Sequence, residues 1–160
     1  MALLARHDVT ALADVRRHPG SRRHPQFASD MLAASLPERG IEYAHFAALG
    51  GRRTPTPGSP NDGWENASFR AYADHLASEE FATGLAALEA LAAERPTAVM
   101  CAEGMWWRCH RRLVADALLV RGWEVAHIAP GGALSEHALP EFAVVEGERL
   151  TYPAPQLRLE

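Results

Sequence analysis

The sequence contains no lysine, and all 16 of its basic residues are arginine. Because alanine is also abundant, the simplest cause of this bias is a GC-rich genome, so the bias alone says nothing about function. No apolar run approaches the roughly 20 residues that a membrane-spanning helix needs. Arg6, His7 and Asp8 interrupt the apolar start, so we expect no secretory leader. These absences predict a cytoplasmic protein that has no membrane partner.

Cysteine is also scarce, with Cys101 and Cys109 as the only two. In a reducing compartment, two thiols are free side chains or metal ligands more often than a structural disulfide. Hydrophobic residues make up 48% of the 160 residues and charged residues 22%, which is ordinary for a soluble globular protein. This length is typical of one domain, which we expect to span residues 1–152, followed by a loose tail over residues 153–160.

Positive charge is concentrated in the first third of the chain, although the net charge is −4. Residues 1–53 contain 8 arginines and 5 acidic residues, and several of these arginines form adjacent pairs. A local positive patch on an acidic protein fits a small anionic ligand better than duplex nucleic acid, whose binding domains are usually basic overall. A small anion is therefore the leading expectation for a partner, and nucleic acid stays open as an alternative.

The hydrophobic pattern predicts alternating strands and helices. Short apolar runs indicate strands over residues 11–15, 41–46, 97–101 and 123–128. Helices are expected over residues 25–39, 65–77, 79–94 and 109–121, and residues 142–152 have the pattern of a β-hairpin. This order indicates an α/β fold: a single domain with a mostly parallel sheet of about four or five strands, helices on both faces and a C-terminal β-hairpin. The strands over 97–101 and 123–128 are expected to be parallel and joined by a right-handed crossover.

One segment, Cys101-Ala-Glu-Gly-Met-Trp-Trp-Arg-Cys-His-Arg111, concentrates the reactive and charged side chains. It connects a predicted strand to a predicted helix, which is the kind of turn at which open α/β folds bind ligands. Arg16 follows another predicted strand, and parallel neighbouring strands end at the same edge of a sheet. The sequence therefore predicts a pocket between these two strand ends.

The arginines near these strand ends are the candidate ligand-binding groups. Guanidinium groups bind phosphate and carboxylate through paired hydrogen bonds, so we assign anion binding to Arg16, Arg108 and Arg111. Asp14 is expected to orient them through an ion pair, and a purely structural pair with Arg16 is an equal alternative. Arginines in two loops form a possible lid, or else a solvated surface: Arg22, Arg23, Arg52 and Arg53.

Cys101 is the predicted nucleophile, because helix N-terminal amides and neighbouring arginines lower the pKa of a thiol. Glu103 is the predicted acid/base. Both thiols are also consistent with small buried hydrophobic side chains. Cys101, Cys109 and His110 are weak candidates for zinc ligands, because the Cys-x7-Cys-His spacing matches no common zinc signature. We therefore predict no cofactor.

These residues are compatible with three functions. The first is an enzyme that acts on a small phosphorylated or nucleotide-like anion, with Cys101 at the centre of the site. The second is a non-catalytic module that binds nucleic acid or nucleotide through arginine and aromatic stacking, for which the candidates are Trp64, Trp106, Trp107, Phe46 and Tyr72. The third is a metal- or redox-sensing protein that uses Cys101 and Cys109.

Several separated blocks of the sequence resemble, in order and spacing, those of a bacterial family named domain of unknown function 488. The blocks are Asp14-Val-Arg16, Ser21-Arg22, Gln26-Phe27, Ile41-Glu-Tyr43, Leu49-Gly-Gly51, Phe69 with Tyr72-Ala73, Cys101-Ala-Glu103, Cys109-His-Arg111 and Val125-Ala-His-Ile128. The resemblance implies no assigned activity. It also implies a strand carrying Thr-Ile-Gly-His-Ser and a helix ahead of the Asp-Val-Arg strand. This chain starts inside that helix, so we expect either a misplaced start codon or a sheet that lacks one member.

Overall fold

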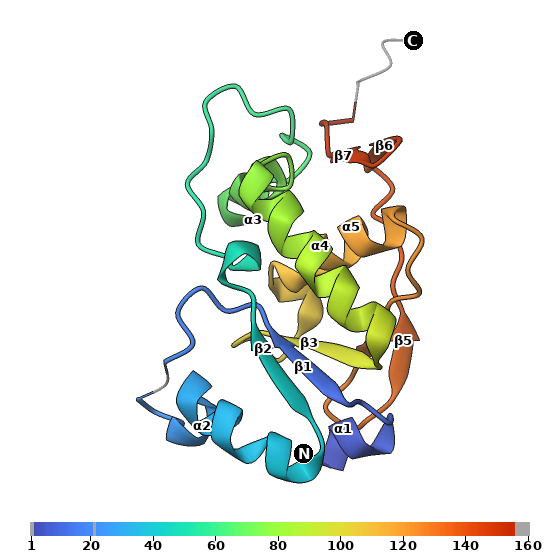
Figure 1. Ribbon diagram of the computed structural model, residues 1–160. Coiled ribbons are helices and arrows are strands. Elements are labelled where there is room, and N and C mark those ends of the chain that lie inside the picture. The colour runs from blue at the N-terminus through green and yellow to red at the C-terminus, as the bar shows by residue number, and fades with distance from the viewer. Residues whose placement is uncertain (1, 21, 156–160) are drawn as a thin grey trace.

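The central sheet has three parallel strands in the computed structural model, which describes residues 2–20 and 22–155. The strand order is β2 (Glu42–His45), β1 (Ala11–Asp14) and β3 (Thr97–Met100). Asp14, the last residue of β1, lies opposite His45 in β2 and Met100 in β3. The carboxyl ends of all three strands therefore meet at one edge of the sheet (Figure 1).

Helices cover both faces of this sheet. Neighbouring residues of β1 point in opposite directions, so this strand packs against the helices on each face. Ala13 contributes to the larger core, together with side chains of α3 (Ala67–His75), α4 (Glu79–Glu94) and α5 (Arg111–Val120). Leu12 contributes to a smaller core with Leu32 of α2 (Ser29–Ser35). In Figure 1, α3, α4 and α5 lie above the strands, and α2 lies below them. The α/β class and the helices on both faces are confirmed.

Capping side chains and prolines set the helix boundaries. The Asn66 side chain accepts hydrogen bonds from backbone N–H groups at the start of α3, and the Ser78 side chain does so at the start of α4. The helix predicted over residues 25–39 is divided into η1 (Pro25–Phe27), α2 and η2 (Pro37–Arg39), because Pro37 has no N–H with which to continue α2. The other short helices are α1 (Ala2–Arg6), η3 (Ala47–Leu49) and η4 (Trp106–Arg108).

The strand predicted over residues 123–128 does not extend the central sheet. Instead, β4 (Ala126–Ile128) pairs antiparallel with β5 (Leu134–Glu136), so the parallel sheet among the described residues has three strands and not the larger number predicted. A cavity of about 230 Å³, lined by residues of β3 and β4, separates the two strands. The C-terminal hairpin is confirmed, because β6 (Val144–Glu146) pairs with β7 (Arg149–Thr151). Gly147 turns this hairpin with a φ of 64°.

None of the helices within the described ranges is both long and apolar enough to cross a membrane. Residues 153–155 leave β7 without regular structure, and the Ala154 N–H donates to Asp62 Oδ1 at 2.8 Å. The rest of the predicted tail, residues 156–160, lies outside the described residues, as does Ser21.

Candidate functional site

A pocket of about 440 Å³ lies at the edge where β1 and β3 end. Its walls come from four segments of the chain that are far apart in the sequence. They combine positive groups, thiols and aromatic rings, including those of Arg16, Arg17, His18, Arg52, Phe69, Tyr72, Cys101, Glu103, Arg108, Cys109 and His110. The fold therefore places both cysteines and four arginines around one hollow.

Asp14 is fully buried and holds the Arg16 guanidinium in place. Its Oδ1 accepts Arg16 Nε at 2.8 Å, and its Oδ2 accepts Arg16 Nη2 at 2.5 Å and the Tyr43 hydroxyl at 2.7 Å. Burial alone would raise the pKa of the Asp14 carboxyl, but the hydrogen bonds from Arg16 and Tyr43 outweigh it and lower this pKa. Asp14 therefore stays ionised at neutral pH and fixes one edge of the guanidinium.

The two thiols line the same pocket, and each affects the ionisation of the other. The Glu103 N–H donates to Cys101 Sγ at 3.2 Å, and the Arg111 N–H at the start of α5 donates to Cys109 Sγ at 3.4 Å. The interaction of the two thiols raises the pKa of Cys101 and lowers the pKa of Cys109, and His110 lowers the pKa of Cys109 further. The lowered pKa expected for Cys101 thus falls on Cys109, and the pair loses its first proton as a unit.

The Gly50-Gly51 pair allows two close approaches beside this pocket. A Cβ on Gly51 would lie 2.8 Å from His110 Nδ1, and a Cβ on Gly50 would lie 2.7 Å from the Cα of Arg17. With no side chain in the way, His110 packs next to Cys109 and its Nε2 bonds the carbonyl oxygen of Val15 at 3.0 Å. The two glycines therefore set the positions of a histidine and an arginine in the pocket wall.

The predicted anion-binding arginines divide between two cavities. Arg16 and Arg108 line the pocket at the strand ends, whereas Arg111 lines the cavity between β3 and β4. Arg111 Nη2 donates to the carbonyl oxygen of Glu103 at 2.6 Å. Arg17 was not among the predicted site residues, yet it lines the pocket beside Arg16. Its only signal in the sequence is the arginine doublet that follows a buried strand.

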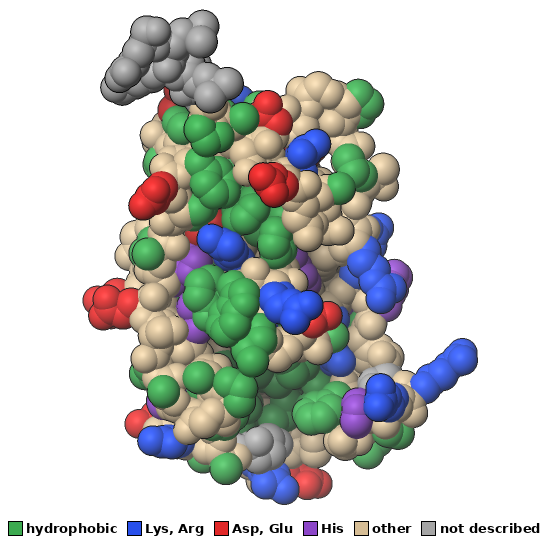
Figure 2. Space-filling view, turned by 180° about the vertical axis from the view of Figure 1, so that it is seen from behind, with side chains coloured by type: hydrophobic (Ala, Val, Ile, Leu, Met, Phe, Trp, Pro, Cys, Tyr) green, Lys and Arg blue, Asp and Glu red, His purple; other side chains and the backbone are tan. Residues whose placement is uncertain are grey.

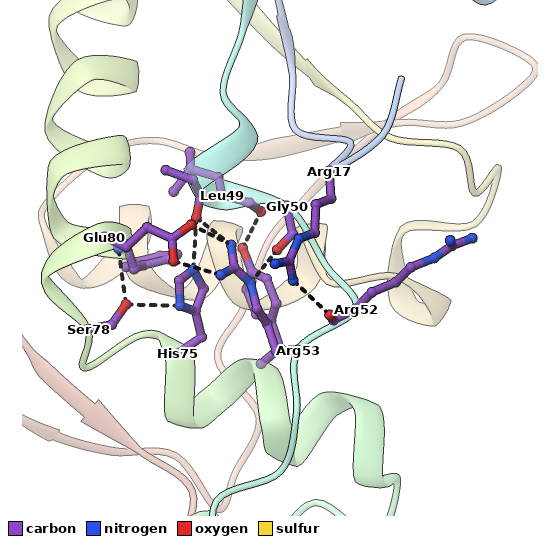
Figure 3. Close-up of polar contacts among 11 residues, drawn as sticks. Arg17, Leu49, Gly50, Arg52, Arg53, His75, Ser78 and Glu80 are labelled. Carbon is purple, nitrogen blue, oxygen red and sulfur yellow. Dashed lines mark hydrogen bonds and ion pairs between the residues drawn. The ribbon is translucent and has the colours of Figure 1, made fainter. Parts of the chain in front are cut away.

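Arg53 does not face the pocket but clamps the short helix η3. Its Nε and Nη2 donate to the carbonyl oxygens of Gly50 and Ala48, both at 2.9 Å. Its Nη1 donates to Glu80 at 2.8 Å. Figure 3 shows these contacts and, beside them, Arg17 reaching the backbone of Arg52, whose own side chain points away from the clamp. Arg53 therefore has a structural place and not that of a lid.

The other predicted lid residues differ in position. Arg52 lines the pocket and has a left-handed backbone, with φ at 59°. Arg22 and Arg23 are exposed and are not part of the pocket lining. Figure 2, seen from behind, shows arginine and histidine side chains on either side of a central hydrophobic patch.

The tryptophans also take separate places. Trp64 is buried in the core, with its ring 5.1 Å from that of Phe69 and 5.3 Å from that of Tyr152. Trp107 is 48% exposed, and Trp106 stacks on His127. No tryptophan lines the pocket at the strand ends, where Phe69 and Tyr72 supply the aromatic surface.

The described residues contain no group of three or more His, Cys, Asp or Glu side chains placed to hold a metal ion. Cys109 Sγ and His110 Nδ1 lie 3.6 Å apart, and the other ring nitrogen of His110 bonds a backbone carbonyl. The geometry thus offers no positive support for the zinc site considered from the sequence.

We expect the protein to lose stability as the pH falls below about 6.5, because His75 is held uncharged. Its Nε2 bonds the Ala48 carbonyl oxygen at 2.8 Å, and its Nδ1 accepts from the Ser78 hydroxyl at 2.9 Å. Burial, together with the charge of Arg53, lowers the pKa of His75. The contribution of His75 to stability is therefore complete above the pKa of histidine in the unfolded chain. It is lost as the pH falls from that value through the lower pKa of His75 in the folded protein. The melting temperature, followed by circular dichroism, should fall less between about pH 7 and pH 5 in His75→Gln than in wild type. Equal slopes would contradict this role.

No curated protein and no solved structure matches the chain. A family model matches residues 1–118, a range that includes the Asp14–Arg16 pair, Gly50-Gly51 and both cysteines. The match covers well over half of the chain and confirms the resemblance seen in the separated sequence blocks. The chain therefore belongs to the family described as domain of unknown function DUF488.

Proposed function

We propose that the protein is an enzyme that acts on a small phosphorylated or nucleotide-like anion in the pocket at the strand ends. The observation that carries this proposal is the joint presence of four arginines and two neighbouring thiols in one cavity. A volume of about 440 Å³ fits a small organic ligand. Glu103 is the sole carboxylate in the described lining, so the pocket favours negative charge.

In this proposal, the arginines bind the phosphoryl oxygens. Asp14 occupies Nε and Nη2 of Arg16, which turns the Nη1 edge of this guanidinium towards the ligand. Arg17, Arg52 and Arg108 supply further N–H groups around the same hollow. Phe69 offers a ring on which a base can stack, as in other sites for nucleotides.

The thiol pair supplies the proposed nucleophile. Cys101 is partly exposed, whereas Cys109 is buried, so Cys101 is the sulfur that a ligand reaches. Cys101 Sγ attacks the phosphorus atom while its proton passes to the Cys109 thiolate. The ester oxygen leaves with its bonding electrons, and Glu103 protonates it. Water then hydrolyses the thiophosphate and releases inorganic phosphate, so no oxidant or reductant is needed.

The test uses inorganic phosphate and AMP as binding probes and 4-nitrophenyl phosphate as a substrate probe. We expect Arg17→Ala to weaken binding about ten- to a hundredfold, since each charge-assisted hydrogen bond contributes about 1.5–3 kcal/mol. Arg39→Ala is the matched control, because Arg39 is exposed at the end of η2 and lies outside the pocket lining. Cys101→Ser should bind both anions and release no 4-nitrophenol.

Three outcomes are informative. Binding without turnover in wild type would replace the enzyme by the non-catalytic nucleotide-binding module. Equal weakening in Arg17→Ala and Arg39→Ala would mean that binding occurs elsewhere on the surface. If none of the three probes binds at millimolar concentration, the proposal is wrong.

A redox-responsive thiol pair is the second candidate, because the two thiols line one pocket and affect each other's ionisation. A hydroperoxide would oxidise the Cys109 thiolate to a sulfenic acid and be reduced to an alcohol. Attack by the Cys101 thiol would then form a disulfide and release water. Mass spectrometry after brief peroxide treatment tests this, and a protein that keeps two free thiols excludes it.

A further inference from the structure

A second cluster of polar side chains is buried where α5, β4 and the residue that follows β5 meet. Asp116, in the middle of α5, and His137, which follows β5, both have fully buried side chains. Asp116 Oδ1 and His137 Nε2 lie 2.6 Å apart, and His137 Nδ1 lies 2.9 Å from Nε2 of His127 on β4. We call this series of hydrogen-bonded side chains the Asp116–His137–His127 relay.

Two aromatic residues hold the relay in place. The Tyr152 hydroxyl donates to Asp116 Oδ2 at 2.6 Å, so both carboxylate oxygens accept hydrogen bonds. Trp106 stacks on His127, with ring centroids 3.8 Å apart and an angle of 1° between the planes. Four segments of the chain thus fix a buried carboxylate and two imidazoles in line. A buried carboxylate linked to two imidazoles indicates a functional site more specifically than a single histidine in the core does.

The hydrogen-bond directions follow from the acceptor-only character of the carboxylate. His137 Nε2 must carry the proton that Asp116 accepts. A neutral His137 then accepts at Nδ1 from the Nε2–H of His127, which leaves Nδ1 of His127 unprotonated. No residue in the described ranges hydrogen-bonds this nitrogen. Burial, with the nearby His137 and Arg111, lowers the pKa of His127 to about 4, so its ring is uncharged at neutral pH.

The outer end of the relay borders the cavity between β3 and β4. His127, Trp106 and Arg111 line it together with aliphatic side chains of α4, α5 and β3. Arg111 Nε is buried and has no hydrogen-bond partner among the described residues. A guanidinium group and an imidazole whose Nδ1 is unprotonated therefore belong to residues that line one small cavity.

We propose that this cavity is a second binding site, in which His127 Nδ1 acts as a general base on a small apolar carbonyl or carboxylate ligand. Arg111 binds the ligand oxygen, and His137 and Asp116 are positioning residues that act through His127. The proposal uses a cavity separate from the pocket at the strand ends, so either one can fail alone.

The proton transfer balances within the relay. His127 Nδ1 takes the proton from the carbon next to the carbonyl, and the C–H electron pair forms the enolate. Its negative oxygen lies beside the Arg111 guanidinium. The Nε2 proton of His127 passes to His137 Nδ1, so the positive charge rests next to the Asp116 carboxylate. The reverse steps return a proton to the ligand, and no oxidant or co-reactant is required.

The first test is ligand-free: ¹⁵N NMR of the histidine side chains at neutral pH, with His127→Gln to assign the signals. We expect an unprotonated Nδ1 and a protonated Nε2 on His127. A protonated Nδ1 would overturn the proposal, because His127 would then accept a proton from a cationic His137 and have no base to offer.

Two variants separate a relay from a structural cluster. The titratable groups around the two imidazoles are Asp116, Arg111 and Tyr152. Tyr152→Phe removes a hydrogen bond from the carboxylate, so the histidine pair should take up its first proton at higher pH. Asp116→Asn removes the negative charge and should lower that pH, by about one unit or tenfold in proton affinity. If neither variant that folds shifts this titration, the relay is excluded.

The ligand class is tested with 4-methyl-2-oxopentanoate in D₂O. Wild type should exchange the protons next to the carbonyl for deuterium about 10²–10⁴ times faster than buffer. His127→Gln should lose this acceleration, and Arg39→Ala, a change outside both cavities, should keep it. No acceleration by wild type would overturn the assignment of a carbonyl ligand, whatever the outcome at the thiol pocket.

Discussion

Replacing Asp14 by alanine is expected to lower the free energy of unfolding by about 3–5 kcal/mol, the usual effect of removing one partner of a buried ion pair. Asp14 is fully buried at the end of the central strand and accepts hydrogen bonds from Arg16 and Tyr43. The Arg16 side chain is only 10% exposed, so it would keep a charge without a counter-ion. Urea denaturation at neutral pH measures this effect.

Two further variants show whether the unpaired charge is the cause. Tyr43→Phe removes one hydrogen bond to Asp14 and should lower the free energy of unfolding by about 1 kcal/mol. The double variant Asp14→Ala/Arg16→Leu removes both charges and should be more stable than Asp14→Ala alone. A loss below about 1 kcal/mol in Asp14→Ala would contradict the argument and show that solvent reaches Arg16.

The same ion pair determines behaviour in acid. The pKa of Asp14 is lowered, so its contribution to stability is complete above the unfolded pKa and is lost as the pH falls through the folded value. The Asp14 and His75 contributions therefore disappear in different ranges, since the ordinary carboxyl pKa lies well below that of histidine. As the pH falls, the protein should therefore lose the stability contribution of His75 first and that of Asp14 last.

The largest expected change in reactivity comes from Cys109→Ser. Cys101 lowers the pKa of Cys109, whereas Cys109 raises the pKa of Cys101, so the pair carries its thiolate on Cys109 at neutral pH. Serine keeps the size of the side chain but does not ionise in this range, so Cys101 loses its thiolate partner. Alkylation of Cys101 by iodoacetamide should then follow a pKa nearer the ordinary value of about 8.5.

At about pH 8, this lowering of the Cys101 pKa should speed alkylation of Cys101 by one to two orders of magnitude, since each pKa unit changes the thiolate fraction tenfold. Mass spectrometry of the labelled peptide measures the rate at each pH. His110→Gln is the matched control, because it removes only the smaller influence of His110 on Cys109 and should give an intermediate profile. An ordinary pH profile in wild type would remove both the shared thiolate and the nucleophile proposed for the pocket.

The sequence indicated the α/β class and the three strands of the central sheet. These follow from local physical chemistry: short apolar runs form buried strands, and charged residues cannot continue into the core. Arg16 and Cys101 therefore lie just after the ends of β1 and β3. Because these strands pair in parallel, the two residues lie at the same edge of the sheet. The separated sequence blocks were likewise sufficient to identify the family.

Sequence patterns did not reveal which way each side chain turns. Arg52 and Arg53 are adjacent, yet one lines the pocket and the other clamps η3 against Glu80. Arg111 was predicted to line the anion pocket but lines the cavity beside β4. This cavity exists because β4 pairs with β5 and not with β3.

The polar networks were equally hidden, because their members lie far apart in the chain. His137 was not a candidate residue, and its role depends on contacts with Asp116 and His127 from other elements. The thiols, too, are eight positions apart, and only the folded turn lets each shift the pKa of the other. Periodicity thus determined where the strands and helices lie, whereas side-chain direction and protonation were decided by contacts between segments that meet only in the tertiary structure.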